Sequence, residues 1–289
     1  MERLSFSEKV FKTIAYILVG VFAMAALYPF IYALAASLSG RAEFEQGLVV
    51  LFPVNPTAEV YQMLFNTTLF WVSYANTLFY TVFGVMWSML ISTTGAYALS
   101  KRRLLFRRQF NFYVVFTMWF SAGMIPNFLN YTNMGVDNRW GMIVAFGVQA
   151  FNIILLRNYF EGVPSEIEEA ARIDGASEIQ LFTKIYLPMS KAALATITLF
   201  YATSRWNGFF WSQILLMNNN DQPLQVYLIS QLAEFRTVLD NLPNTDLLTF
   251  SPDSYAYAIL VLSIIPIIIV YPFIQKFFAK GVNMGGVKG

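Results

Sequence analysis

The chain has 289 residues, of which 57% are hydrophobic and only 12% are charged. Soluble domains usually carry about a quarter charged residues, so this composition is typical of an integral membrane protein. The formal net charge of +2 indicates no nucleic-acid partner, and the lack of Cys and His excludes disulfides, thiol catalysis, zinc sites built on those ligands and a histidine proton relay.

Six apolar runs are long enough to cross a bilayer, which takes about 20 helical residues. The first run is too long and too aromatic for a signal peptide, and no small-residue cleavage site follows it, so we expect a retained helix. The chain therefore predicts an all-α polytopic membrane protein, with six transmembrane helices in one domain over residues 1–289. The runs lie near residues 11–38, 73–99, 110–130, 140–160, 189–217 and 254–276.

Basic residues predict the orientation of these helices, because Lys and Arg in short loops stay on the cytoplasmic side. Fifteen of the 19 lie in segments that would face one side, whereas Arg41, Arg139 and Arg236 would face the other. The remaining one, Arg205, falls inside the fifth run. We therefore expect both termini, including a tail at 277–289, in the cytoplasm.

Two segments are predicted on the outer side. Residues 40–70 include Pro53 and Pro56, which favour a turn or an extended chain over a regular helix. The 218–253 segment is the longest, and it begins with Asn218, Asn219 and Asn220. This polar segment is long enough to meet a partner above the membrane, although a solvated connector explains it equally well.

The positions of the acidic residues indicate which energy source would drive transport. None of the 17 falls inside an apolar run, whereas proton- and cation-coupled carriers usually need buried carboxylates. The chain also lacks the Gly-rich Lys-Ser/Thr loop that binds nucleotide phosphates. We therefore expect an external energy source, and if ATP supplies it, another chain binds the nucleotide.

The loop between the fourth and fifth runs predicts a short helical hairpin. Ser165 with Glu168 has the spacing of a capping box, which starts a helix. Gly175 lets the chain turn, because Gly takes left-handed backbone angles without penalty. Ser177 with Gln180 repeats the capping pattern for a second helix.

Small and charged residues give this hairpin the surface of a docking site. Ala170 and Ala171 would allow another subunit to come close, and Glu169 supplies charge for orienting it. Pro188 ends the second helix where the fifth run begins. An ordinary amphipathic loop helix is the alternative interpretation of Glu-Ala-Ala alone.

The full spacing carries a family resemblance. Glu169-Ala170-Ala171, three residues, Gly175, nine residues and Ile185-x-Leu187-Pro188 resemble the signature of the membrane subunits of ATP-driven, binding-protein-dependent ABC importers. The stretch from Gly95 to Lys101 and the final Gly-Gly-Val-Lys-Gly are similar to carbohydrate importers of the maltose type. The tail resembles that of the smaller membrane subunit of these importers. The group includes importers of polysaccharides such as alginate.

The resemblance implies a permease subunit of the bacterial inner membrane with a cytoplasmic coupling hairpin at 165–186. It implies a related second permease subunit, two ATPases that bind ATP and Mg, an extracytoplasmic solute-binding protein and an oligosaccharide or polysaccharide substrate. This chain would hold no cofactor, no metal and no catalytic residue. The implied ATPase-docking residues are Glu169, Ala170, Ala171, Asp174, Gly175 and Pro188, and Gly285, Gly286 and Lys288 would reach the ATPase interface.

The fifth run contains a polar and aromatic cluster at Arg205, Trp206 and Asn207. A sugar offers apolar faces and a rim of hydroxyls, so aromatic rings beside amide and guanidinium donors suit it. The structural alternative is that Arg205 pairs with a backbone carbonyl or a neighbouring subunit. Gln149 and Asn152 in the fourth run are further candidates for the substrate pathway, although interhelical hydrogen bonds also explain them.

Three other functions remain open at this point. An ABC permease for amino acids, peptides or phosphate would share the docking signature. An ion-coupled carrier or channel would act without ATP and would need intramembrane carboxylates, which these runs lack. A non-transporting scaffold would have no need of the full docking spacing.

Overall fold

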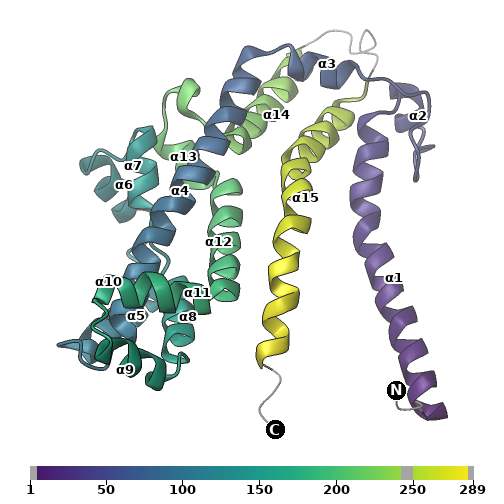
Figure 1. The fold of residues 1–289 in the computed structure, drawn as a ribbon. Helices are drawn as coiled ribbons and strands as arrows, with labels where there is room; N and C mark the ends of the chain where they lie inside the picture. The colour runs from purple at the N-terminus through teal and green to yellow at the C-terminus, as the bar shows by residue number, and fades with distance from the viewer. Residues whose placement is uncertain (1–4, 242–249, 286–289) are drawn as a thin grey trace. The chain divides into compact units, whose positions relative to one another are not determined.

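The computed structural model describes residues 5–241 and 250–285, and the described chain is helical throughout with no strand (Figure 1). It divides into two units. One comprises Met1–Thr68 with Leu228–Pro266, and the other comprises Leu69–Tyr227 with Ile267–Gly289.

The first unit is built on the long helix α1 (Phe6–Ser37). A capping box starts it, since the Ser5 side chain accepts from the Glu8 N–H and the Glu8 side chain accepts in return. Near its other end Ala35 and Ala36 pack with Val49 and Tyr257. The small core leaves most of α1 exposed and apolar, as a helix facing lipid requires.

Short elements complete the first unit. Helices α2 (Arg41–Glu45) and α3 (Glu59–Phe65) flank the Pro53–Pro56 segment, which is not helical, as the prolines predicted. The Ser37 hydroxyl lies 2.7 Å from the Tyr61 hydroxyl and ties α1 to α3. Helix α15 (Pro252–Gly285) supplies Tyr257 to the core.

The second unit is organised along α4 (Thr68–Ser100). Close to the C-terminal end of α4, Ala96 and Leu99 belong to a buried cluster with Leu156, Tyr186 and Ile197. Nearer the N-terminal end, Tyr80 belongs to a second cluster with residues 142, 143, 215 and 216. Helix α4 therefore joins two packed regions.

The other helices of this unit are short. They are α5 (Arg107–Trp119), α6 (Met124–Asn133), α7 (Arg139–Ala145), α8 (Ala150–Glu161), α9 (Ser165–Ile173), α10 (Glu178–Gln180), α11 (Leu187–Met189), α12 (Lys191–Trp206) and α13 (Phe210–Leu215). A π-helix covers Leu181–Tyr186 and a 3₁₀ turn covers Asn219–Asp221.

Three of the predicted apolar runs are not continuous helices. The run near 110–130 divides into α5 and α6, bent by 118°, and the run near 140–160 divides into α7 and α8, bent by 50°. The run near 189–217 divides into α12 and α13, separated by residues 207–209. Hydropathy hides these breaks, because the residues beside them are apolar as well. By length and composition, α1 and α4 are each sufficient to cross a membrane.

The 218–253 segment also differs from the polar loop that we expected. Helix α14 (Leu224–Asn241) occupies much of it. Leu224, Tyr227 and Leu228 are buried, and their i, i+3, i+4 spacing places them on one helix face. The asparagine-rich start of the segment conceals this apolar stripe.

Candidate functional site

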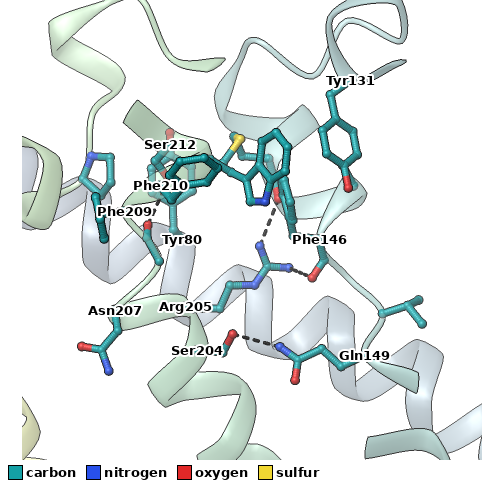
Figure 2. A pocket seen from close by; sticks show the side chains of 16 residues that line it. Tyr80, Tyr131, Phe146, Gln149, Ser204, Arg205, Asn207, Phe209, Phe210 and Ser212 are labelled. Atoms are coloured by element: carbon teal, nitrogen blue, oxygen red, sulfur yellow. Dashed lines mark hydrogen bonds between the residues drawn. The ribbon is translucent and has the colours of Figure 1, made fainter. Parts of the chain in front are cut away.

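Two helix breaks enclose a cavity of about 380 Å³ in the second unit (Figure 2). Phe146, Val148 and Gln149 come from the break between α7 and α8, and Asn207 and Gly208 come from the break between α12 and α13. Irregular backbone at membrane depth is tolerated where it lines a cavity or is buried in protein. Aromatic residues dominate the remaining wall: Tyr80, Tyr131, Phe209, Phe210 and Trp211.

Arg205 holds the end of α7 at this cavity. Its Nη1 donates to the Met142 carbonyl at 3.0 Å, and its Nη2 donates to the carbonyls of Ile143 at 3.0 Å and Phe146 at 2.7 Å. The last carbonyls of a helix lack partners within the helix and carry partial negative charge. The backbone pairing that we weighed as the structural alternative for Arg205 is therefore present, although Arg205 also lines the cavity.

Gln149 connects the break between α7 and α8 to helix α12. Its Nε2 donates to the Ser204 hydroxyl at 2.9 Å, and its Oε1 accepts from Asn152 Nδ2 at 3.0 Å. Its backbone N–H donates to the Tyr201 hydroxyl at 3.2 Å. These bonds hold the start of α8 against α12.

The predicted pathway residues divide into two groups. Arg205, Gln149 and Asn207 line the cavity. Trp206 is only 7% exposed and packs edge-on against Tyr74, with ring centroids 6.2 Å apart, outside the lining. Asn152 is 1% exposed and reaches the cavity only through Gln149.

Much of the aromatic wall, including Tyr131 and Phe146, was not among the predicted pathway residues. Tyr131, Phe146 and Trp211 pack on one another with ring centroids 5.1 to 6.1 Å apart. Each helix break contains a glycine close to a polar residue. These are Gly147 and Gln149 between α7 and α8, and Asn207 and Gly208 between α12 and α13. This pairing was a usable signal for the wall.

The predicted hairpin is present at α9 and the helix that follows it. Gly175 has φ +81°, which is the left-handed turn that the sequence predicted. The Ser177 side chain accepts from the Gln180 N–H, and the Gln180 side chain accepts from the Ser177 N–H, which confirms the second capping box. Pro188 lies two residues before the bend at Ser190, where the second helix meets α12 at 83°.

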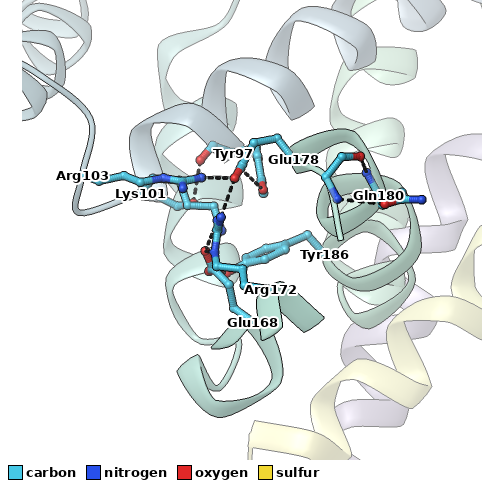
Figure 3. Close-up of polar contacts among 10 residues, drawn as sticks. Tyr97, Lys101, Arg103, Glu168, Arg172, Glu178, Gln180 and Tyr186 are labelled. Carbon is cyan, nitrogen blue, oxygen red and sulfur yellow. Dashed lines mark hydrogen bonds and ion pairs between the residues drawn. The ribbon is translucent and has the colours of Figure 1, made fainter. Parts of the chain in front are cut away.

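The first capping box is wrong. Pro164 is the N-cap of α9, and no side chain caps the helix. Glu168 instead accepts from Lys101 Nζ at 2.7 Å and from Arg172 Nη2 at 2.6 Å, and it also accepts from the Tyr186 hydroxyl. Lys101 and Tyr186, from other elements, and Arg172, one turn further along α9, therefore bind the carboxylate that the local pattern had assigned to the helix start (Figure 3).

Glu168 is the centre of a charged network between α4 and the hairpin. Burial alone would raise the pKa of Glu168, but the hydrogen bonds from Lys101, Tyr186 and Arg172 lower it to about 2. Lys101 is 8% exposed, and its Nζ lies 3.6 Å from the centroid of the Tyr186 ring and 4.3 Å from that of Tyr97. The ammonium is thus held by both an ion pair and two ring faces.

Glu178 extends this network into the second helix of the hairpin. It pairs with Arg172 at 2.7 Å and with Arg103, and it accepts from the Tyr97 hydroxyl at 3.0 Å. Burial would raise the pKa of Glu178, whereas the bonds from Arg172, Arg103 and Tyr97 lower it to about 2. Both helices of the hairpin are therefore tied to the end of α4.

The opposite side of the hairpin is open. Five of the six predicted docking residues are exposed, and the sixth, Ala171, is half-buried. Ile173 is 86% exposed beside them. The exposed members are Glu169, Ala170, Asp174, Gly175 and Pro188.

The segment at Asn218, Asn219 and Asn220 lies against α4. Asn76 Nδ2 donates to the Asn220 carbonyl at 2.7 Å and to the Gln222 carbonyl at 3.0 Å. The Tyr80 hydroxyl donates to the Asp221 carbonyl at 2.8 Å. The three asparagines remain exposed on this anchored turn.

The predicted tail contact lies largely outside the described residues. Gly285 is the last residue of α15. Gly286 and Lys288 fall beyond residue 285, so the structure does not describe them.

Comparison with known proteins places these features in context. Residues 95–284 match the family described as "binding-protein-dependent transport system inner membrane component". The chain is 38% identical over 286 residues to the polygalacturonan/rhamnogalacturonan transport system permease protein YtcP of Bacillus subtilis, covering 98% of this chain and 99% of YtcP. It is 28% identical over 273 residues to the arabinooligosaccharides transport system permease protein AraQ of Halalkalibacterium halodurans, covering 92% and 93%.

A solved structure is similar as well. A chain from the crystal structure of a bacterial ABC transporter involved in the import of the acidic polysaccharide alginate superposes with a TM-score of 0.83. The two are 48% identical, and the match covers 96% of this chain and 100% of the other.

Proposed function

Because the chain belongs to the family of binding-protein-dependent transport system inner membrane components, we propose that it forms part of the pathway by which an ABC importer carries an oligosaccharide or polysaccharide. The family match over residues 95–284 carries the proposal, since it includes the hairpin and all of the residues that line the cavity except Tyr80. The substrate class is supported by the names of the polygalacturonan, arabinooligosaccharide and alginate systems.

We propose six membrane spans with both termini in the cytoplasm of the bacterial inner membrane. The spans are α1, α4, the bent pair α5 and α6, the bent pair α7 and α8, α12 continuing into α13, and α15. The excess of Lys and Arg in the N-terminal, 101–108 and 157–191 segments supports this orientation.

The hairpin at 165–186 couples this subunit to an ATPase. Its exposed face presents Glu169, Ala170 and Asp174, while the Glu168 and Glu178 pairs hold its other face to α4. Two ATPases bind ATP and Mg, and this chain contributes no catalytic residue. A second permease subunit completes the pathway, and a solute-binding protein delivers the sugar.

Two further contacts belong to this assembly. The anchored turn at Asn218–Asn220 meets the solute-binding protein, and the tail with Gly285, Gly286 and Lys288 reaches the ATPase interface. The exposure of the three asparagines supports the first contact. Single Cys at 220 should crosslink to the binding protein, and single Cys at 288 should crosslink to an ATPase.

Reconstitution tests the function. Proteoliposomes that hold the co-purified complex should take up labelled saccharide only with binding protein outside and ATP inside. A complex whose ATPases cannot hydrolyse ATP is the control. Uptake that persists in this control and is abolished by an ionophore would instead identify an ion-coupled carrier.

Labelling tests the topology and the docking. The chain has no native Cys, so single Cys at 105 and 180 should label only from the cytoplasm, and those at 45 and 220 only from outside. Cys in place of Ala170 should crosslink to an ATPase. Labelling of position 180 from outside would overturn both the orientation and the docking.

A further inference from the structure

The cavity carries one full charge, and it is positive. Of the 16 described residues that line it, Arg205 is the only ionised one, and none is Asp or Glu. Within the described chain Arg205 takes part in no salt bridge, and Asp221, the acid whose backbone carbonyl binds Tyr80 of the lining, lies 3.7 Å from Arg139. The carbonyl dipoles at the end of α7 offset part of this charge, but no carboxylate in the lining completes the pairing. The cavity therefore favours an anion.

The hydrogen bonds of Arg205 leave room for such a partner. A guanidinium has five N–H donors, and three donate to the carbonyls of Met142, Ile143 and Phe146. These neutral acceptors fix the position of the group and leave its charge in place. The Nε side of the group packs against Gly84 of α4. One Nη1–H therefore remains, without a hydrogen-bond partner within the described chain, to meet a ligand.

A helix end adds to the positive potential. Helix α8, with 12 residues, starts at the cavity, where Val148 and Gln149 belong to the lining. No side chain caps this N-terminus, because the side-chain carbonyl of Gln149 accepts from the Asn152 side chain. A helix start carries partial positive charge that attracts anions, and broken membrane helices often direct this end at a substrate. Arg205 and α8 thus favour the same charge.

The rest of the wall suits a sugar ring. Phe146 and Trp211 offer apolar faces, and Ser204, Asn207 and Gln149 offer hydroxyl and amide groups. A volume of about 380 Å³ lies at the small end of the range for ligand pockets, roughly 300 to 1,000 Å³. It is therefore sized for one or two rings of a chain, and not for a long polymer.

We infer that this cavity is a transit site for uronate residues, in which Arg205 and the start of α8 attract the sugar carboxylate. This inference rests on the proposed function, and it adds the residues that select an acidic sugar over a neutral one. Arg205 would serve two purposes, capping α7 with three bonds and presenting its remaining charge to the substrate.

The sharpest test changes the charge of the cavity and leaves Arg205 intact. Gln149→Glu is nearly isosteric, and a carboxylate at this position still accepts from Asn152 and from the Ser204 hydroxyl. Gln149→Met removes the same polar contacts without adding charge. Gln62→Glu, on an exposed residue of α3 in the other unit, is the matched control for the substitution itself.

Uptake is measured in proteoliposomes with the whole complex, using trigalacturonate and its fully methyl-esterified form. The same binding protein serves every variant, so a change in the acid-to-ester ratio arises in the permease. Gln149→Glu should lower uptake of the acid roughly 10- to 100-fold, because the new carboxylate competes for Arg205 and the sugar then loses the equivalent of one charged hydrogen bond. Uptake of the ester should change by less than about threefold.

Each other outcome is decisive. If Gln149→Glu lowers acid and ester equally, or changes neither, the cavity does not select a carboxylate. If the wild type imports only the ester, the inference is also overturned, although the importer function stands. If the wild type imports neither sugar while its ATPases work, the proposed substrate class itself is wrong. Should Gln149→Glu not assemble, Asn207→Asp applies the same charge from the other helix break.

Discussion

Lys101 and Glu168 form an ion pair of 2.7 Å across 67 residues of sequence. Lys101 directly follows α4, and Glu168 lies in α9 of the docking hairpin. The same α4 places Gly84 against the Arg205 side chain at the cavity. One helix therefore contacts both the docking hairpin and the charged wall of the proposed transit site.

Lys101→Met should uncouple ATP hydrolysis from uptake. The substitution keeps the length of the side chain but removes the ion pair and the contact of the charge with Tyr186. Losing a charged hydrogen bond costs about 1.5 to 3 kcal/mol, so the melting temperature in nanodiscs should fall by roughly 3 to 12 °C. Arg102→Met, at the exposed neighbour, is the control and should change neither property.

A double-mutant cycle separates the pair from other effects of Lys101. Because Lys101→Met and Glu168→Gln remove the same ion pair, the double variant should lose less coupling than the sum of the two single losses. The measurement is uptake per ATP hydrolysed. Strictly additive losses, together with normal assembly, would show that the pair does not couple the hairpin to α4.

Gly84→Ala should disturb Arg205, while Gly95→Ala should be tolerated. A Cβ at position 84 would lie 2.8 Å from Nε and 3.1 Å from Cδ and Cζ of Arg205, whose guanidinium is held by three carbonyls. Overpacking of this kind costs about 1 to 3 kcal/mol. At Gly95, in the same helix, a Cβ meets nothing within 4 Å, and Ala should stabilise α4 slightly. The melting temperatures of the two variants test this difference. Equal values would show that Arg205 does not need the space left by Gly84.

Substitutions at Gly175 should be graded by their tolerance of left-handed angles. With φ at +81°, Val is strongly disfavoured and Asn is tolerated, because Asn visits this region more readily than other side-chain-bearing residues. We expect Gly175→Val to lose uptake and ATPase docking, and Gly175→Asn to keep most of both. Crosslinking from a cysteine that replaces Ala170 measures the docking. If the Val variant keeps full uptake and docking, the left-handed turn at Gly175 is not needed for the ATPase contact.

The Glu168 network should make the stability of the hairpin depend on acid pH. The folded pKa of Glu168 is about 2, below its ordinary value of 4.5. A carboxyl whose pKa is lowered by folding stabilises the folded state at any pH above its ordinary pKa. This contribution is lost as the pH falls toward the pKa of the folded state. Glu168→Gln should therefore lower the melting temperature at pH 7, and the difference from wild type should close between pH 4.5 and 2.

A matched variant controls for general acid damage. Glu166→Gln changes an exposed residue of the same helix, so its melting temperature should follow that of the wild type across the same pH range. A difference between Glu168→Gln and wild type that persists at pH 2 would show that the effect does not come from the carboxylate charge.

Local patterns in the sequence determined the membrane class, the turn at Gly175 and the capping box at Ser177. Each depends on residues that are neighbours in the chain. The membrane class follows from the length of the apolar runs, the turn from a glycine that can take positive φ, and the capping box from a serine three positions before a glutamine. The polar residues Arg205, Gln149 and Asn207 also stood out, because such side chains are rare in apolar runs. Local chemistry was enough to identify them.

The tertiary structure alone decided where those residues act. Glu168 matched a helix cap locally, but the buried Lys101, 67 residues away in the chain, is a stronger partner for a carboxylate than a backbone N–H. Trp206 and Arg205 are adjacent in sequence, yet one helical step of about 100° turns Trp206 toward Tyr74 and Arg205 toward the cavity. The two helix breaks that form the cavity lie within continuous apolar sequence. Arg205 lies about 60 residues away from the break after α7, and only its bonds to the carbonyls at this helix end show what stabilises that break.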